Sequence, residues 1–217
     1  MRKLKLAPSK LNYNLGGCHR CFAAGLNGES WPDRPFPGIF SRLDRHQRAY
    51  FDGKPTSAID PRLPPGVVRN AAGVASQPFV HAGVELRIRG TMDAVAELDN
   101  STLLVIDYKS SIPNDRLGSH YREQLSAYRW ALEHPLNGEA RSVSGMGLLV
   151  ICPESMADTD RGLAQLVSAT WIPVDYDESW FESLLEHVAE IAVDPECAVS
   201  HQYCDWCELR EQLVAGL

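Results

Sequence analysis

The sequence predicts an α/β fold in which a central mixed sheet is flanked by helices. Several short apolar segments in the middle of the chain have the length and the period-two alternation of strands. Longer segments with apolar residues at helical spacing precede, separate and follow them. A chain of 217 residues suits one domain, which we place at 1–217, with its core at 79–175.

The first expected helix covers residues 38–51. Its apolar side chains, among them Ile39, Leu43 and Tyr50, recur at the spacing of one helical face. Residues 53–78, which follow, contain five prolines and several glycines. Such a composition disfavours regular structure, and we expect a loop or a partial lid there.

Three strands are expected next. Residues 79–89 alternate apolar and polar side chains, as a half-buried strand does. A second strand covers 91–98, Asp99 and Asn100 form a turn, and a third strand covers 101–109.

The second half of the chain predicts helices at 118–134 and 177–193, the latter with acidic residues in its first turn. Apolar strands at 145–152 and 165–174 lie between them. The expected order is therefore helix, three strands, helix, two strands, helix.

The charge and the apolar content restrict the class of protein. A formal net charge of -7 counts against a simple duplex-binding module, although an enzyme that binds DNA only around metal ions stays compatible with it. No apolar run approaches the ~20 residues that span a bilayer, and the basic N-terminus lacks the apolar segment of a signal peptide. We expect a soluble, cytoplasmic protein without membrane contact, in which six cysteines are thiols or metal ligands.

The third strand ends in two opposite charges, Asp107 and Lys109. Side chains two apart on a strand share a face, so these two lie side by side. Asp93, on the preceding strand, is nearly as far from the turn at Asp99 as Asp107 is. If the two strands pair antiparallel, the two carboxylates face one another.

Adjacent carboxylates repel unless a cation lies between them or one of them takes a proton. Mg²⁺ or Mn²⁺ prefers such oxygen ligands and keeps several waters for chemistry. A lysine beside them could hold the attacking water or offset charge on a phosphate. The simpler alternative is that Asp107 and Lys109 form an ordinary ion pair and that Asp93 is an unrelated turn residue.

Three motifs in order resemble the RecB-like branch of the PD-(D/E)XK nuclease superfamily. They are Gly-x-x-Asp at Gly90–Asp93, an apolar strand ending in Asp-x-Lys at Asp107–Lys109, and Gln-x-x-x-Tyr at Gln124–Tyr128. The motifs lie within residues 80–132, and the expected order of elements fits the restriction-endonuclease-like core of that superfamily.

The resemblance implies roles for these residues. Asp93, Asp107 and the main-chain carbonyl of Tyr108 would bind the metal, and Lys109 would position the attacking water. Gln124 and Tyr128 would contact nucleic acid or support the site. The alternatives are a solvated helix position for Gln124 and a core aromatic for Tyr128, the latter equally compatible with the sequence.

The family usually adds a histidine or glutamate from an earlier helix. His46, with Asp44 behind it on the helix at 38–51, is the candidate for this catalytic and metal-binding role. His81 is a second possibility, but it begins a strand, where the family does not place this residue.

Two Cys-x-x-Cys pairs, Cys18 with Cys21 and Cys204 with Cys207, lie near opposite ends of the chain. Such pairs are typical of a four-thiolate metal site. A redox-active pair or two unrelated pairs are the alternatives. Cys152, within an apolar strand, is expected in the core.

The resemblance extends to the branch related to AddB and the CRISPR-associated exonucleases, whose members carry an iron–sulfur cluster. There, one cysteine precedes the nuclease core and three follow it, whereas two and two is the natural count here. Cys197 could replace Cys18 or Cys21 and restore the familiar pattern. The segments 1–26 and 195–217 would then be joined by a [4Fe–4S] cluster or, alternatively, by Zn²⁺.

Together these features predict a metal-dependent deoxyribonuclease that degrades single-stranded DNA from an end, with protein partners in DNA processing or repair. The single-strand preference rests on the resemblance alone. The alternative is a non-catalytic DNA-binding or complex-assembly subunit with a structural zinc site.

Overall fold

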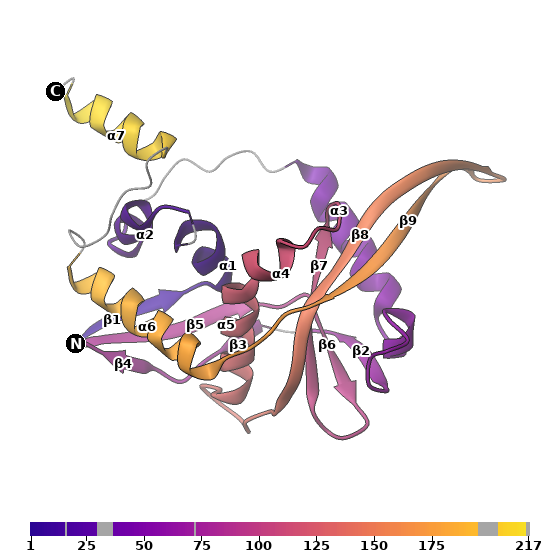
Figure 1. Cartoon of the computed structure of the whole chain (residues 1–217), viewed down its shortest axis with the longest axis horizontal. Helices are drawn as coiled ribbons and strands as arrows, with labels where there is room; N and C mark the ends of the chain where they lie inside the picture. Colours follow the sequence, from indigo (N-terminus) through magenta and orange to yellow (C-terminus); the bar gives the residue numbers. More distant parts are fainter. Residues whose placement is uncertain (16, 30–36, 72, 195–203, 216–217) are drawn as a thin grey trace.

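The structure is a computed structural model, and it describes all residues except 16, 30–36, 72, 195–203 and 216–217. The chain forms two sheets, and one helix, α5 (Arg122–Glu133), packs against both of them. A further helix, α3 (Gly38–Phe51), covers the opposite face of the larger sheet (Figure 1). This arrangement confirms the expected α/β fold with a central mixed sheet flanked by helices.

The smaller sheet is built around β5 (Val84–Thr91). This strand pairs in parallel with β1 (Arg2–Leu6) and antiparallel with β3 (Gly73–Ala75) and β4 (Phe79–His81). The alternation expected for this segment is present in part: Val84, Leu86 and Ile88 are buried, but Glu85 between them is buried as well. The sequence analysis missed β1, which lies at the basic N-terminus.

The larger sheet has the order β2-β6-β7-β8-β9. Its strands are β2 (Gly66–Asn70), β6 (Ala94–Leu98), β7 (Leu103–Ser110), β8 (Val143–Thr159) and β9 (Gly162–Pro173). All neighbours are antiparallel except β7 and β8, which are parallel and joined through a helix. The short turn after β6 and the long helical crossover after β7 produce these two kinds of pairing.

The two faces of β7 pack against different helices. Leu104 and Ile106 are buried on the side of α3 (Gly38–Phe51), in a cluster that includes Phe51. Val105 is buried on the opposite side, against Leu125 of α5 (Arg122–Glu133). Since side chains alternate along a strand, Asp107 lies on the same face as Val105, beneath α5.

The helices near the two ends of the chain lie together. The segment α1 (Pro8–Lys10), η1 (Leu11–Leu15) and α2 (His19–Leu26) follows β1. Helix α2 contacts both α6 (Glu178–Val193) and α7 (Asp205–Ala215). Apolar residues of α2, α5, α6 and the smaller sheet form one buried cluster.

Strands β8 and β9 continue past the rest of the sheet as a two-stranded hairpin, which projects beyond α3 in Figure 1. The pairing of β7 with β8 ends at Ser110 and Ile151, whereas β8 and β9 remain paired as far as Thr159 and Gly162. Cys152 lies where β8 leaves the sheet and is only half-buried, so the expectation that it belongs to the core is wrong.

Several element boundaries differ from the sequence prediction. The helix at 38–51 is confirmed, but the strand expected at 79–89 is a hairpin that turns at Ala82 and Gly83, both with positive φ. The helix expected at 118–134 is interrupted at Tyr121, which separates α4 (Leu117–His120) from α5.

The expectation of an irregular segment at 53–78 is wrong in part. A 3₁₀ turn, η2 (Thr56–Ala58), and the strands β2 and β3 form within it. The prolines lie between these elements, where no ladder hydrogen bond is lost. Gly66 allows β2 to approach β6, because a Cβ there would lie 2.8 Å from Leu98 Cα.

Among the described residues, no helix combines the length and the apolar character needed to cross a membrane.

Gly147, near the start of β8, tests how closely β8 packs against β9. A Cβ at this position would lie 2.6 Å from the carbonyl oxygen of Ile172 and 2.7 Å from Cη2 of Trp171. We expect Gly147→Ala to lower the free energy of unfolding by about 1–3 kcal/mol in urea titrations, because β9 must move away. Gly25→Ala in α2, where a Cβ meets no atom within 4 Å, is the matched control and should not destabilise.

Candidate functional site

The pairing of β6 with β7 places two acidic residues together. Ala94 lies opposite Ile106, so Asp93 and Asp107 occupy the next position in the antiparallel register. The backbone N–H of Tyr108 donates to Asp93 Oδ2 at 2.8 Å, which fixes the Asp93 side chain against β7. Both carboxylates therefore lie at the open end of this hairpin.

Asp107 is buried, with 3% of its surface exposed. Gln124 Nε2, from α5, donates to Asp107 Oδ1 at 2.9 Å, and Lys109 forms an ion pair with Asp107 Oδ2. Both oxygens of the carboxylate are therefore held by side chains that the sequence motifs singled out.

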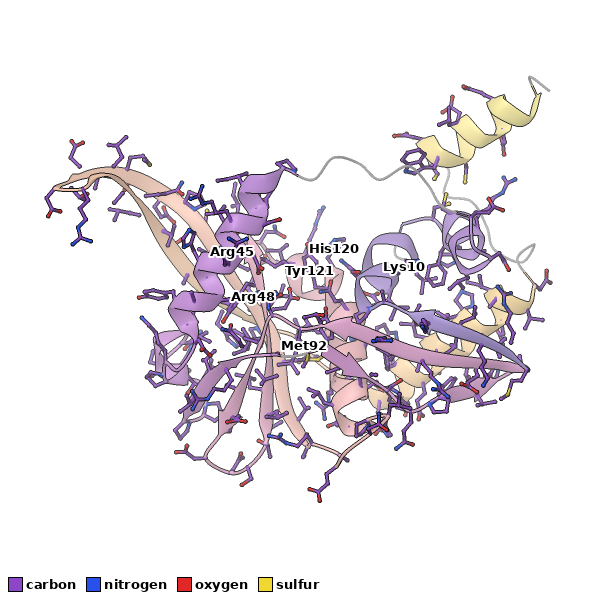
Figure 2. All side chains as sticks on the ribbon, turned by 180° about the vertical axis from the view of Figure 1, so that it is seen from behind. Lys10, Arg45, Arg48, Met92, His120 and Tyr121 are labelled. Atoms are coloured by element: carbon purple, nitrogen blue, oxygen red, sulfur yellow. The ribbon has the colours of Figure 1, made fainter. Side chains whose placement is uncertain are left out.

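Lys109 also lies against an aromatic side chain. Its Nζ is 4.3 Å from the centre of the Tyr121 ring, and the edge of that ring contacts His120 at a centroid distance of 4.8 Å. Tyr121 occupies the break between α4 and α5. Figure 2 shows Tyr121 and His120 on the molecule seen from behind, together with Arg48 and Met92.

Tyr128 supports the site and belongs to the core. Its hydroxyl donates to the backbone carbonyl of Thr91 at 2.9 Å, and its ring is buried between α5 and the sheet. This hydrogen bond anchors the connection between β5 and β6, in which Asp93 lies.

The face of α3 that meets the site carries Asp44, Gln47 and Arg48. Arg48 forms an ion pair with Asp93 and donates to the backbone carbonyls of Met92 at 3.1 Å and Asp93 at 3.0 Å. Asp44 accepts from Arg48 Nε at 2.9 Å, and Gln47 donates to the Ser110 hydroxyl at 2.9 Å. The sequence analysis did not single out Arg48 for the site.

His46 lies on a different side of the same helix. Its side chain is exposed, and within the described residues no contact joins it to Asp93 or Asp107. The i, i+4 spacing of Asp44 and Arg48 was the signal that could have identified the inward face of α3. His81 lies on β4 beside Glu186 and Glu190 of α6, at 3.7 and 3.6 Å.

Burial makes both carboxyl groups weak acids, and the pKa of Asp93 is raised further by its neighbour. Burial raises the pKa of Asp93, and the neighbouring Asp107 raises it further, to about 7, against the opposing effects of the Tyr108 N–H and of Arg48. Burial also raises the pKa of Asp107, although Lys109 opposes this. A hard divalent cation would relieve the repulsion, so the donor set fits such an ion.

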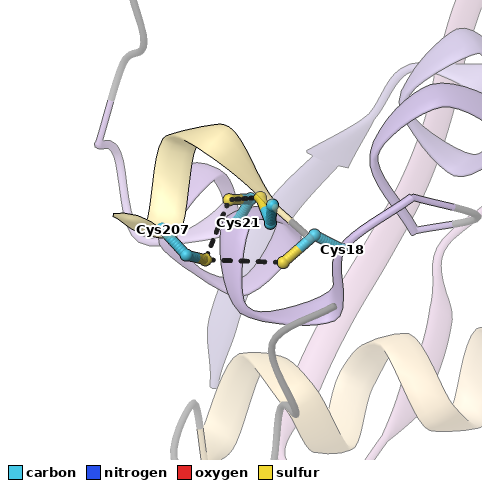
Figure 3. A group of neighbouring side chains, drawn as sticks. Cys18, Cys21 and Cys207 are labelled. Atoms are coloured by element: carbon cyan, nitrogen blue, oxygen red, sulfur yellow. Dashed lines mark hydrogen bonds between the residues drawn. The ribbon is translucent and has the colours of Figure 1, made fainter. Parts of the chain in front are cut away.

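The four paired cysteines form a second cluster. Cys18 and Cys21 come from the start of α2, and Cys204 and Cys207 come from the start of α7. All four sulfurs lie within 4.8 Å of one another, with 3.5 Å between Cys21 and Cys204 and 3.6 Å between Cys18 and Cys207 (Figure 3). The expected juxtaposition of the two terminal segments is therefore present.

Burial disfavours the charged, thiolate form of these cysteines. Burial raises the pKa of Cys21 and raises that of Cys207 to about 11. A bound cation reverses this tendency, because it favours the thiolate form. An ion pair between Arg20 and Glu211, at 2.9 Å, adds a second contact between α2 and α7. Cys197, the predicted substitute ligand, lies outside the described residues.

Residues 25–212 match the family model of the PD-(D/E)XK nuclease superfamily. The chain belongs to this superfamily. The sequence analysis assigns Asp93, Asp107 and Lys109 to the acidic pair and the lysine after which the superfamily is named, and these assignments stay a prediction. No curated protein matches the chain.

Two solved structures are similar to this superfamily member. SSO0001 shares 16% identity over 87% of this chain and 75% of its own, with a TM-score of 0.52, and supports the fold alone. A candidate exonuclease from Eubacterium rectale shares 11% identity over 94% of this chain and 87% of its own. Its TM-score of 0.39 is too low to support any further argument.

The raised pKa values of the two carboxyl groups predict an unusual pH dependence in the absence of added divalent ions. Between pH 4 and pH 7 the unfolded chain loses its Asp93 proton while the folded chain retains it, so stability falls as the pH rises. We expect the free energy of unfolding to drop by at least ~1 kcal/mol between pH 5 and pH 7.5.

Urea titrations of the wild type and of Asp93→Asn at both pH values measure this drop. The variant has no proton to lose at position 93 and should show a clearly smaller decrease. Equal decreases in the two proteins would assign the pH dependence to other groups.

Proposed function

We propose that this protein is a metal-dependent deoxyribonuclease that hydrolyses phosphodiester bonds with Mg²⁺ or Mn²⁺. The observation that carries the proposal is the contact of Asp107 with both Lys109 and Gln124, opposite Asp93. They are the residues that the motifs of the sequence analysis single out, and they lie at one end of a strand pair in a chain that belongs to a nuclease superfamily.

Asp93, Asp107 and the main-chain carbonyl of Tyr108 would hold the divalent ion. When bound, such an ion would polarise the scissile phosphate and favour ionisation of a water molecule. Arg48 and Lys109 partly offset the negative charge of the two aspartates, yet the pKa of each carboxyl group remains raised. Burial is the largest cause of both raised pKa values, and a bound cation would favour the ionised carboxylates that burial disfavours. His46 is exposed, and its role as a ligand stays a prediction.

Lys109 would act on the reacting groups directly. Its ammonium can donate hydrogen bonds to the attacking water and to a phosphate oxygen as negative charge develops there. Asp107 and the ring of Tyr121 hold the lysine from two sides. Gln124 fixes the Asp107 carboxylate, and Tyr128 fixes the backbone beside Asp93. These contacts pre-organise the site before substrate binds.

Single-stranded DNA, degraded from an end, is the substrate we propose. Tyr121 and the exposed His120 lie next to Lys109 and carry the kind of ring on which unpaired bases stack. In a duplex the bases already stack on one another and would not be available to these rings. Protein partners in DNA processing or repair belong to the same proposal.

A nuclease assay tests the proposal. We expect Mn²⁺-dependent cleavage of end-labelled single-stranded DNA, and Asp107→Asn should reduce its rate by ~100-fold or more, since the metal and Lys109 both depend on this carboxylate. Asp99→Asn, in the exposed turn at the other end of the hairpin, is the matched control and should retain activity.

Equal cleavage by the wild type and Asp107→Asn would overturn the assignment of the site. Binding of DNA without any cleavage would favour the alternative, a non-catalytic DNA-binding or assembly subunit. A duplex substrate and an RNA strand of the same sequence test the proposed strand preference and sugar preference.

The cysteine cluster is proposed to hold a structural metal that ties α2 to α7. Four sulfurs at ~2.3 Å from one tetrahedral ion lie ~3.8 Å apart, close to the 3.5 and 3.6 Å found here. A [4Fe–4S] cluster, which the family resemblance implies, places an inorganic core between the sulfurs and needs them farther apart. The sulfur separations therefore favour a single ion such as Zn²⁺.

Metal analysis and an absorption spectrum of anaerobically purified protein distinguish these centres. We expect about one zinc per chain and no band near ~400 nm, whereas a four-iron cluster would give both iron and that band. Cys207→Ser should lose the metal and increase proteolysis of α7 while nuclease activity is reduced much less. Cys152→Ser, at a half-buried cysteine outside the cluster, should change neither.

A further inference from the structure

Arg48 is held from several directions at the candidate active site. Its Nε donates to both oxygens of Asp44, at 2.9 and 3.1 Å, and its Nη1 donates to the carbonyls of Met92 and Asp93. Its Nη2 forms the ion pair with Asp93 Oδ1. Every guanidinium nitrogen therefore has an acceptor, and the side chain is only 25% exposed.

These contacts fix the place of a positive charge. An exposed arginine on a helix surface exchanges partners with water, and its ion pairs contribute little. The planar guanidinium of Arg48 instead matches a carboxylate on each side and two carbonyls of the Asp93 segment. The positive charge of Arg48 thus has a fixed place in the site, in direct contact with Asp93, one of the two carboxylates proposed as metal ligands.

The charge count of the site limits the number of ions it can accept. When ionised, Asp44, Asp93 and Asp107 face Arg48 and Lys109, which leaves a single negative charge. One divalent ion reverses this to a single positive charge, which a substrate phosphate can balance. A second divalent ion would add two more positive charges in a partly buried place, where such repulsion is poorly screened.

We propose that Arg48 takes the place of a second metal ion, so that the site works with a single divalent cation. This inference rests on the proposed nuclease function and concerns how the same site is charged. In two-metal sites the paired ions share the stabilisation of the attacking and leaving oxygens. Here the guanidinium of Arg48 supplies part of that positive charge. Unlike a second metal ion, it is part of the chain and does not have to bind from solution.

The same arrangement carries a cost in affinity. Arg48 competes with the divalent ion for Asp93 and repels it at short range. Neutralising position 48 should therefore tighten binding of the first ion or admit a second one. If Arg48 only supports the structure of Asp93, its removal should instead weaken ion binding.

Titration of the full-length protein with Mn²⁺, followed by calorimetry and by the electron paramagnetic resonance of free Mn²⁺, tests the inference without DNA. The same titration of Asp107→Asn measures Mn²⁺ binding elsewhere on the protein, and subtracting it leaves the binding at the carboxylate site. We expect the wild type to bind a single Mn²⁺ there, and Arg48→Met and Arg48→Gln to bind it about tenfold more tightly or to bind a second ion. Two neutral variants are used because either one could fold poorly.

Two further variants serve as controls. Arg48→Lys keeps a positive charge and should keep single-ion binding, and Arg42→Met removes an exposed arginine from the same helix and should bind as the wild type does. Two ions in the wild type, or unchanged or weaker binding in both neutral variants, would overturn the role of Arg48 and leave the nuclease proposal standing. No Mn²⁺ binding that depends on Asp107 would overturn both.

Discussion

The antiparallel pairing of β6 with β7 is the constraint on which the site depends. Its register places Asp93 beside Asp107, and the Tyr108 N–H that completes this end of the pairing is also the donor that holds Asp93. The surrounding elements then supply what two close carboxylates require, namely Gln124 from α5, Lys109 from β7 itself and Arg48 from α3. A shift of one residue in this register would turn Asp107 to the other face of the sheet, away from Asp93 and Gln124.

The sequence predicted the parts of the fold that depend on local pattern. The helix at 38–51, the strands around Asp93 and Asp107, and the cysteine pairs each carry their signal within a few residues. It did not predict β2 within the proline-rich segment, because that strand forms only where β6 offers a partner. Arg48 was missed for a related reason: its role depends on how α3 crosses the sheet, which no local pattern records.

The carboxylate site and the thiol cluster are held in place in different ways. The carboxylate site lies on strands whose side chains are fixed by close packing, whereas the thiol site joins two helices that share few other contacts. In each of them burial disfavours the charged form of the side chains, carboxylates in one and thiolates in the other, and each is therefore expected to gain stability from its own kind of cation, one that binds the charged form. The hard oxygen ligands and the soft sulfur ligands keep the two kinds apart.

The separation of the paired cysteines along the chain has a consequence for biosynthesis. Cys21 and Cys207 lie 186 residues apart, so the thiol site is completed only after the ribosome has made both sheets and α6. A chain that stops within α6 would contain every residue of the carboxylate site and half of the thiol site. Such a chain could not bring the four sulfurs together, so the contact between the two terminal segments forms late in synthesis.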